Sequence, residues 1–263
     1  MTTNPILTSI DDFGTATVTL NRGELHNAFD ESLIAQLTAA LEKLGGDESV
    51  RAVVLAADGK SFSAGADLNW MQKMASYSRD QNLADARLLA KLMATLDQLP
   101  KPTIARVQGS AFGGGVGLIA CCDIAIGVYD AQFALSEARL GLIPAVISPY
   151  VVSAIGARNS RRYFITGERF DAERALQIGL LHEICYADEL DQVVEKVVDA
   201  LLECGPQAQM ACKQLVRDVH YGRGNIDLIE HTAQKIADIR SSHEGREGIG
   251  AFLEKRAPKW LKQ

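Results

Sequence analysis

Two glycine-rich segments, each directly after a predicted strand, constrain the fold of this chain more than any other feature. They are residues 61–67 and residues 109–115, and they follow the apolar, β-branched runs 51–57 and 103–107. Small residues let the backbone approach a ligand closely, and a helix that begins after such a loop presents unpaired N–H groups. Two such ends that meet at one oxygen atom form an oxyanion hole. Tight strand-to-helix turns explain either segment taken alone equally well.

Hydrophobic periodicity places predicted strands and helices in alternation, which indicates an α/β architecture. A helix is predicted over residues 30–44, with Asp30 as its N-cap and Gly45 as its stop, and another over residues 72–99. Ser148 and Pro149 have the pattern of an N-cap followed by a proline. After Gly205 only helices are predicted, so we expect an α/β core over 1–204 and a helical subdomain over 205–263. The predicted strands are residues 15–20, 51–57, 103–107, 124–128, 133–135 and 184–186.

Charge and cysteine content exclude several classes of protein. The net charge of -6 and the pI near 5.4 argue against a nucleic-acid binder. The 5 cysteines are odd in number and two of them are adjacent, and no CxxC spacing is present, so neither a disulfide framework nor a zinc site is expected. Residues 1–8 lack the pattern of a signal peptide, and the apolar runs are too short to span a membrane. We therefore expect a cytoplasmic protein without a membrane span or a bound metal.

Residues 115–120 match the dinucleotide pattern G-x-G-x-x-A, and Glu137 lies at a suitable distance downstream. The match falls late in the chain and inside a glycine run, and Glu137 does not stand at a clear strand end. Nicotinamide binding is therefore disfavoured.

Motifs along nearly the whole chain, taken in order and spacing, resemble the crotonase family, that is, the enoyl-CoA hydratase/isomerase superfamily. Within that family the chain is most similar to bacterial methylglutaconyl-CoA hydratases. This closer resemblance rests on residues 140–151, and it implies a role in leucine or isoprenoid catabolism. The resemblance implies an α/β fold, a crotonase-like spiral of ββα units with a C-terminal helical subdomain, assembled as a homotrimer or a dimer of trimers (a homohexamer). The motifs are residues 20–22, 27–28, 62–68, 101–105, 109–115, 122–125, 133–137, 140–144 and 252–256.

The resemblance also implies catalytic roles. The N–H groups of Ala66 and Gly114 match the family's oxyanion hole, and Glu137 matches one of its two catalytic carboxylates. Hydration of an enoyl thioester needs a proton delivered to Cα and a water activated at Cβ, and one well-placed carboxyl group can serve both. A surface ion-pair partner is the alternative interpretation of Glu137.

Five further residues match positions that contact coenzyme A. Ala64, Asp67 and Leu68 match positions that line the adenine and pantetheine groups. Phe252 and Lys255 match C-terminal positions that reach CoA, often across a subunit boundary. Coenzyme A is part of the substrate, so an acyl-CoA thioester is the expected partner and no separate cofactor is implied.

Gly117 stands where the two-glutamate hydratases carry their second carboxylate, three residues after Gly114. The favoured function is hydration of a 2-enoyl-CoA with a branched or carboxylated, 3-methylglutaconyl-type acyl group. A single-glutamate enoyl-CoA isomerase is the first alternative, and a catalytically weak RNA- or partner-binding homologue is the second. Trp70, Met71 and Met74 are either core residues or the wall of the acyl pocket.

Overall fold

The structure of the protein is a computed structural model that describes residues 4–221 and 227–261. A six-stranded sheet forms its centre, in the order β1-β2-β3-β5-β7-β10. The hairpin of β1 and β2 is antiparallel, and every other neighbouring pair in this sheet is parallel. The strands are β1 (Ile6–Ile10), β2 (Thr15–Leu20), β3 (Ala52–Ala57), β5 (Thr103–Val107), β7 (Ile124–Val128) and β10 (Glu183–Cys185).

A second sheet of four short strands has the order β4-β6-β8-β9. The first three of these strands are parallel, and β9 pairs antiparallel with β8. Strands this short show little hydrophobic periodicity in the sequence. Only one of the four was predicted: the strand expected at 133–135 overlaps the third strand of this sheet, residues 132–134. The strands are β4 (Ser61–Ser63), β6 (Ser110–Phe112), β8 (Gln132–Ala134) and β9 (Arg169–Asp171).

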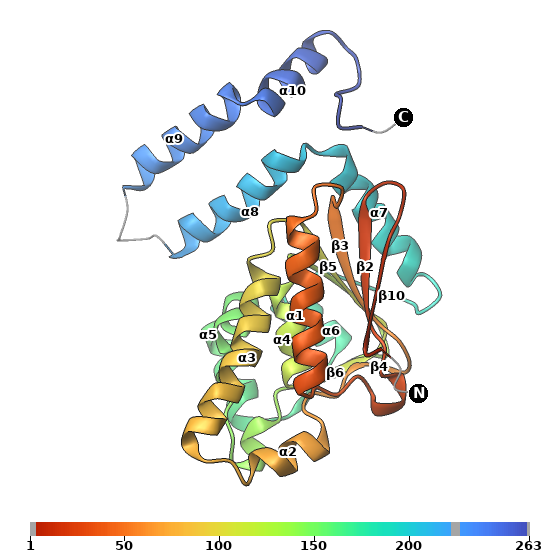
Figure 1. Cartoon of the computed structure of the whole chain (residues 1–263), viewed down its shortest axis with the longest axis vertical. Coiled ribbons are helices and arrows are strands. Elements are labelled where there is room, and N and C mark those ends of the chain that lie inside the picture. Colours follow the sequence, from red (N-terminus) through yellow and green to blue (C-terminus); the bar gives the residue numbers. More distant parts are fainter. Residues whose placement is uncertain (1–3, 222–226, 262–263) are drawn as a thin grey trace.

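The chain builds both sheets at once in repeated ββα turns, which confirms the predicted fold class. Strands β3, β5 and β7 enter the large sheet, each is followed by a strand of the small sheet, and a helical segment then leads to the next turn. In Figure 1 helices α1 and α3 lie on one side of the large sheet and α7 on the other. The helices of the core are α1 (Glu31–Gly46), α2 (Leu68–Met74), α3 (Arg79–Asp97), α4 (Gly114–Cys121), α5 (Ser148–Thr166), α6 (Ala172–Ile178) and α7 (Leu190–Glu203), with short 3₁₀ turns η1 (Gly23–Leu25) and η2 (Glu137–Leu140).

Helix ends agree with the sequence at Asp30 and differ elsewhere. The Asp30 carboxylate accepts the Leu33 N–H at 2.8 Å, so this predicted N-cap is confirmed. The stop predicted at Gly45 is wrong by two residues, because α1 continues through Gly46 and its C-cap is Asp47.

The single helix predicted over 72–99 is in fact two helices, α2 and α3. The break has a local cause, since Ser78 and Gln81 form a reciprocal capping box that starts α3. Ser148 is likewise not the cap of α5 but its first residue. Its hydroxyl donates to Ala145 O at 2.8 Å, and Ile147 stands at the N-cap position without a side-chain bond.

After α7, three helices lie above the core in Figure 1: α8 (Pro206–Tyr221), α9 (Leu228–Ser241) and α10 (His243–Leu253). Glu244 ties α10 to α8, because its carboxylate accepts the N–H groups of Gln207 at 3.0 Å and Ala208 at 2.8 Å. These are two of the otherwise unpaired donors at the start of α8. Lys213 of α8 pairs with Asp123 of the core at 2.8 Å.

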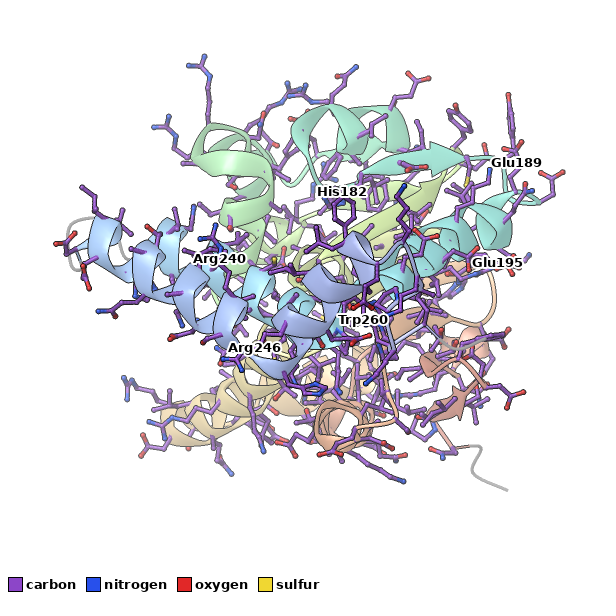
Figure 2. All side chains as sticks on the ribbon, turned by 90° about the horizontal axis from the view of Figure 1, so that it is seen from above. His182, Glu189, Glu195, Arg240, Arg246 and Trp260 are labelled. Carbon is purple, nitrogen blue, oxygen red and sulfur yellow. The ribbon has the colours of Figure 1, made fainter. Side chains whose placement is uncertain are left out.

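The segment after α10 returns to the core at Trp260. Arg51 donates to the carbonyl oxygens of Trp260 and Cys204 at 3.2 and 2.8 Å, and the Trp260 indole donates to Glu203 O at 3.0 Å. The Trp260 ring lies against Gly248 of α10, and Figure 2 labels Trp260 in a view from above. Two sets of contacts therefore orient α10: Glu244 binds the start of α8, and Trp260 packs against Gly248.

No helix in residues 4–221 or 227–261 has the length and apolar character needed to cross a membrane.

Candidate active site

Three parallel strands of the small sheet, β4, β6 and β8, end at one edge. Ser63 pairs with Ala111, and Ala111 pairs with Phe133, so the loops that follow the three strands start side by side. These loops contain Ala66, Gly114 and Glu137, in that order. In α/β sheets the crevice outside the carboxyl ends of parallel strands is where ligands bind. The structure thus brings the three predicted catalytic positions to one edge of one sheet.

Ala66 is held by Phe29 in a parallel β-bridge. The Phe29 N–H donates to Gly65 O at 2.6 Å, and Phe29 O accepts the Asp67 N–H at 2.8 Å. Because successive N–H groups of an extended chain point to opposite sides, the Ala66 N–H points away from Phe29. Within the described part of the chain this N–H has no hydrogen-bond acceptor.

Gly114 is the first residue of α4, so its N–H belongs to the unpaired donors at the positive end of a helix. Gly113 precedes it with φ 50° and ψ −116°, a conformation that requires glycine. The Gly113 N–H donates to Ala134 O at 2.9 Å, which fixes the start of the helix against β8. A Cβ atom added at Gly65 would lie 2.9 Å from Phe112 O, so the two glycine-rich loops are in contact.

Glu137 follows β8 and opens the η2 turn, partly buried against the second loop. A Cβ atom added at Gly113 would lie 3.1 Å from Oε1 of Glu137, and Oε2 is buried without a hydrogen-bond partner among the described residues. Burial raises the pKa of this carboxyl group above its ordinary value, and a hydrogen bond from its own backbone N–H opposes the shift only in part. A carboxyl group in this state holds its proton at higher pH than an exposed one, which suits a general acid.

Gly117 lies one turn below Gly113 on α4, and its own N–H donates to Gly113 O at 3.2 Å. A Cβ atom added at Gly117 would lie 2.3 Å from Cγ2 of Ile147 and 3.4 Å from Cε of Met93. The space that a side chain at position 117 would need is therefore filled by Ile147, which is 3% exposed.

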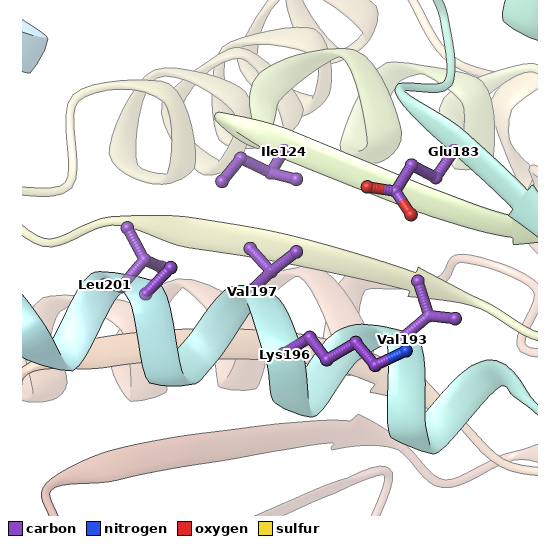
Figure 3. A pocket seen from close by; sticks show the side chains of 7 residues that line it. Ile124, Glu183, Val193, Lys196, Val197 and Leu201 are labelled. Atoms are coloured by element: carbon purple, nitrogen blue, oxygen red, sulfur yellow. The ribbon is translucent and has the colours of Figure 1, made fainter.

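A surface pocket of about 380 Å³ lies away from these residues, between α7 and the strands β7 and β10. Figure 3 shows Glu183 and Lys196 facing each other across an otherwise apolar lining. The pocket contains none of the predicted site residues. We therefore assign the chemistry to the edge where β4, β6 and β8 end, because backbone N–H donors and the Glu137 carboxyl group meet there. The pocket is lined by Ile124, Glu183, Val193, Lys196, Val197, Ala200 and Leu201.

A family model described as enoyl-CoA hydratase/isomerase matches residues 12–263, which is nearly the whole chain. The chain belongs to the enoyl-CoA hydratase/isomerase family. It is therefore an enzyme of this family, and an acyl-CoA thioester substrate is consistent with that membership.

Relatives in this family cover nearly the whole chain. An enoyl-CoA hydratase from Shewanella pealeana has a crystal structure that is 49% identical and superposes with a TM-score of 0.93, over 97% of this chain and 96% of that one. The 2,3-dehydroadipyl-CoA hydratase of Escherichia coli is 31% identical over 92% of each chain. The trans-2-decenoyl-[acyl-carrier-protein] isomerase of Streptococcus mutans is 29% identical over 97% of each chain. The family thus includes relatives named for hydration and for isomerisation.

The first group of predicted CoA contacts lies in the loop between β4 and α2. Ala64 and Leu68 are exposed, Leu68 to 81%, so they are free to meet a ligand. The Asp67 carboxylate instead caps α2 by accepting the Asn69 N–H at 2.8 Å and is 3.7 Å from Arg22. Contact of these residues with CoA stays a prediction, and the Asp67 carboxylate already serves as the N-cap of α2.

Phe252 and Lys255 are not brought to this edge within one chain. Phe252 is in the last turn of α10 and Lys255 lies two residues after that helix, which Figure 1 places at the opposite end of the long axis from α2. Phe252 is 82% exposed and Lys255 is also exposed. If these residues contact the CoA of this site, they must come from another copy of the chain.

Sequence reasoning missed Phe29 and Ile147, which shape the site without supplying its chemistry. Phe29 aligns Ala66 through its backbone, and its ring contacts Gly114, since a Cβ atom there would lie 2.6 Å from Cε2 of the ring. The resemblance at residues 27–28 stops one residue short of it, and Ile147 lies in the stretch 140–151 without any catalytic signal of its own. Trp70 is buried and donates to Asp85 at 3.2 Å, so it is a core residue.

Proposed function

We propose that this enzyme adds water across the double bond of a 2-enoyl-CoA. The Ala66 and Gly114 N–H groups bind the thioester oxygen, and Glu137 acts as general acid and base. The observation that carries the proposal is the position of the Glu137 carboxyl group, packed over Gly113 beside a helix start whose N–H groups are free. A carboxyl group without an ion-pair partner in residues 4–221 and 227–261, next to N–H donors at a helix start, fits proton transfer to a carbon beside a stabilised oxyanion.

The steps use only these groups. The water oxygen bonds to Cβ, the electrons of the double bond move to the thioester, and negative charge develops on the oxygen between Ala66 and Gly114. The Glu137 carboxyl group gives its proton to Cα and receives one from the attacking water, so it ends as it began. Each backbone donor contributes ~10²–10³ to the rate, by comparison with the loss of single oxyanion-hole donors.

A branched or carboxylated acyl group of the 3-methylglutaconyl type is the substrate class that we favour. The loop after Glu137 is apolar and exposed at Leu140, Leu142 and Ile143, which suits a branched chain. The Escherichia coli relative is named for a dehydroadipyl group, which bears a distal carboxylate. Arg139, exposed and two residues after Glu137, is the candidate partner for such a carboxylate.

A panel of thioesters with product identification by mass spectrometry and NMR tests this function. Crotonyl-CoA, 3-methylglutaconyl-CoA and a 3-enoyl-CoA are incubated separately, and a 3-hydroxyacyl product from the first two is expected. Arg139→Gln should lower kcat/KM for the carboxylated substrate and leave crotonyl-CoA unaffected. Migration of the double bond in the 3-enoyl-CoA, with no hydroxyacyl product from either 2-enoyl-CoA, would replace the proposal with the isomerase alternative.

We further propose that the chain assembles as a trimer or a dimer of trimers, in which residues 205–263 mediate assembly and place Phe252 and Lys255 of one copy at the CoA of the next. The support is the distance of α10 from the site in its own chain, together with the exposure of Phe252. Co-expression of a Glu137→Gln chain with a Lys255→Glu chain should recover activity in mixed oligomers, because some sites then combine intact residues from both. A fully active monomer in sedimentation experiments would contradict the proposal.

A further inference from the structure

Glu137 and Ile147 lie beside two glycines at the start of α4, Gly113 and Gly117. Gly113 is the N-cap of α4 and Gly117 lies four residues later, joined to it by the Gly117 N–H to Gly113 O bond, so they lie about 6 Å apart along the helix axis. Oε1 of Glu137 covers Gly113, and Cγ2 of Ile147 covers Gly117. The apolar side chain of Ile147 therefore lies about one helical turn from the point of α4 that the Glu137 carboxyl group covers.

Ile147 is fixed in this position. It is 3% exposed, Met93 approaches the same point of α4 from α3, and Ile147 O accepts the Val151 N–H at 3.1 Å in the first turn of α5. A close-packed site of this kind leaves no room for a side chain at 117 or for a water molecule between Ile147 and the helix. The atoms nearest to a Cβ at 117 are therefore apolar carbon atoms of Ile147 and the methyl group of Met93.

We propose that Ile147 is a positioning residue that keeps the Glu137 carboxyl group in dry, apolar surroundings and, paired with Gly117, commits the site to a single carboxyl group. The pair works as a steric unit: a large residue at 147 requires glycine at 117, and a carboxylate at 117 requires a small residue at 147. This inference rests on the proposed role of Glu137. The partnerless Oε2 atom and the effect of burial on the pKa of Glu137 support it.

The test compares Ile147→Ala with Ile155→Ala. Ile155 is a matched control, because it is buried to the same extent, at 3% exposed, lies in α5 eight residues after Ile147, and is not among the described side chains nearest to a Cβ at Gly113 or Gly117 of α4. The pKa of Glu137 is measured directly by ¹³C NMR of glutamate-labelled protein, with Glu137→Gln used to assign the signal. Ile147→Ala should move this pKa down toward that of an ordinary glutamate and move the upper limb of the kcat–pH profile with it. Ile147→Val, which keeps Cγ2, should restore the wild-type value, and Ile155→Ala should leave it unchanged.

An unchanged Glu137 pKa in Ile147→Ala would overturn the inference, as would an equal change in Ile155→Ala. The NMR titration does not depend on catalysis, so these outcomes differ from failure of the proposed function, which would appear as full activity in Glu137→Gln.

A second pair of variants tests the steric unit. Gly117→Glu alone should lower the melting temperature and abolish activity, because its side chain collides with Ile147. Gly117→Glu combined with Ile147→Gly should recover folding, since glycine is accepted at the N-cap position that Ile147 occupies. A Gly117→Glu protein with the wild-type melting temperature would refute the steric coupling.

Discussion

Phe29 touches both proposed oxyanion donors: its backbone brackets Ala66 in a β-bridge, and its ring lies against Gly114. One residue therefore sets the relative position of two loops that are far apart in the sequence. Misplacement of catalytic groups by even a small distance is costly to the rate.

Phe29→Ala is expected to destabilise the fold and to lower the rate more than its stability loss explains. The side chain is 1% exposed, and removal of such a ring costs about 3–5 kcal/mol. Measured on the folded fraction at low temperature, kcat should fall while KM changes little. Phe170→Ala, a buried ring in β9 that stacks on Phe133, is the control and should lose stability with less effect on kcat. Equal kcat losses in both variants would show that Phe29 has no special relation to the site.

The Gly114 N–H can be tested by comparing alanine with proline at this position. Both substitutions add a Cβ atom that presses on the Phe29 ring, but only proline removes the donor. Proline is otherwise accepted in the first turn of a helix, so the fold should be affected similarly by the two. We expect Gly114→Pro to be slower than Gly114→Ala by ~10²–10³, the value of one oxyanion donor. The two variants should be equally slow if Gly114 contributes only its shape.

Glu137→Gln should abolish turnover without loss of stability at neutral pH. The raised pKa means that the folded protein binds the Glu137 proton more tightly than the unfolded chain does. The stability of the wild type therefore falls as pH rises from the ordinary glutamate pKa through the raised one, and above that window it carries the full cost of a buried charge. The melting temperature of Glu137→Gln, relative to wild type, should be higher at pH 8 than at pH 4. A difference that is independent of pH would contradict the assigned burial effect.

Glu244 should matter for the C-terminal helices and not for the chemistry. Glu244 belongs to α10, but its carboxylate accepts N–H groups at the start of α8 and so does the work of an N-cap for that helix. Loss of a cap costs roughly 0.5–2 kcal/mol of stability. Glu244→Ala is expected to lower the melting temperature and weaken any oligomer seen by sedimentation. Glu195→Ala, at an exposed position of α7 that Figure 2 shows pointing away from the core, should change neither.

How far the sequence predicts this structure depends on the range over which each feature is determined. Strands β2, β5 and β7 match their predicted bounds, since a buried strand needs only a short apolar run to be recognised. The N-cap at Asp30 could likewise be predicted, because it depends only on one side chain and the first turn of the helix that follows it. The short strands β4 and β6 have no such signal, because three residues acquire their structure from their neighbours in the sheet.

The same distinction holds in the site. The two glycine-rich loops and Glu137 were visible as motifs, but their meeting at one edge depends on the pairing of β4, β6 and β8. From the sequence, Gly117 shows only that the second carboxylate of the two-glutamate hydratases is absent at this position. That Ile147, thirty positions later in the chain, fills the vacant space is a tertiary contact, and no local pattern encodes it.

Hydration in D₂O tests the central claim most directly. Wild-type enzyme and Glu137→Gln are incubated with a 2-enoyl-CoA, and the acyl chain is analysed by mass spectrometry and NMR. The proposed mechanism predicts a 3-hydroxyacyl product that carries deuterium at Cα with the wild-type enzyme, and unreacted substrate with Glu137→Gln. Equal formation of the deuterated product by both proteins, or no product with the wild type, would contradict it.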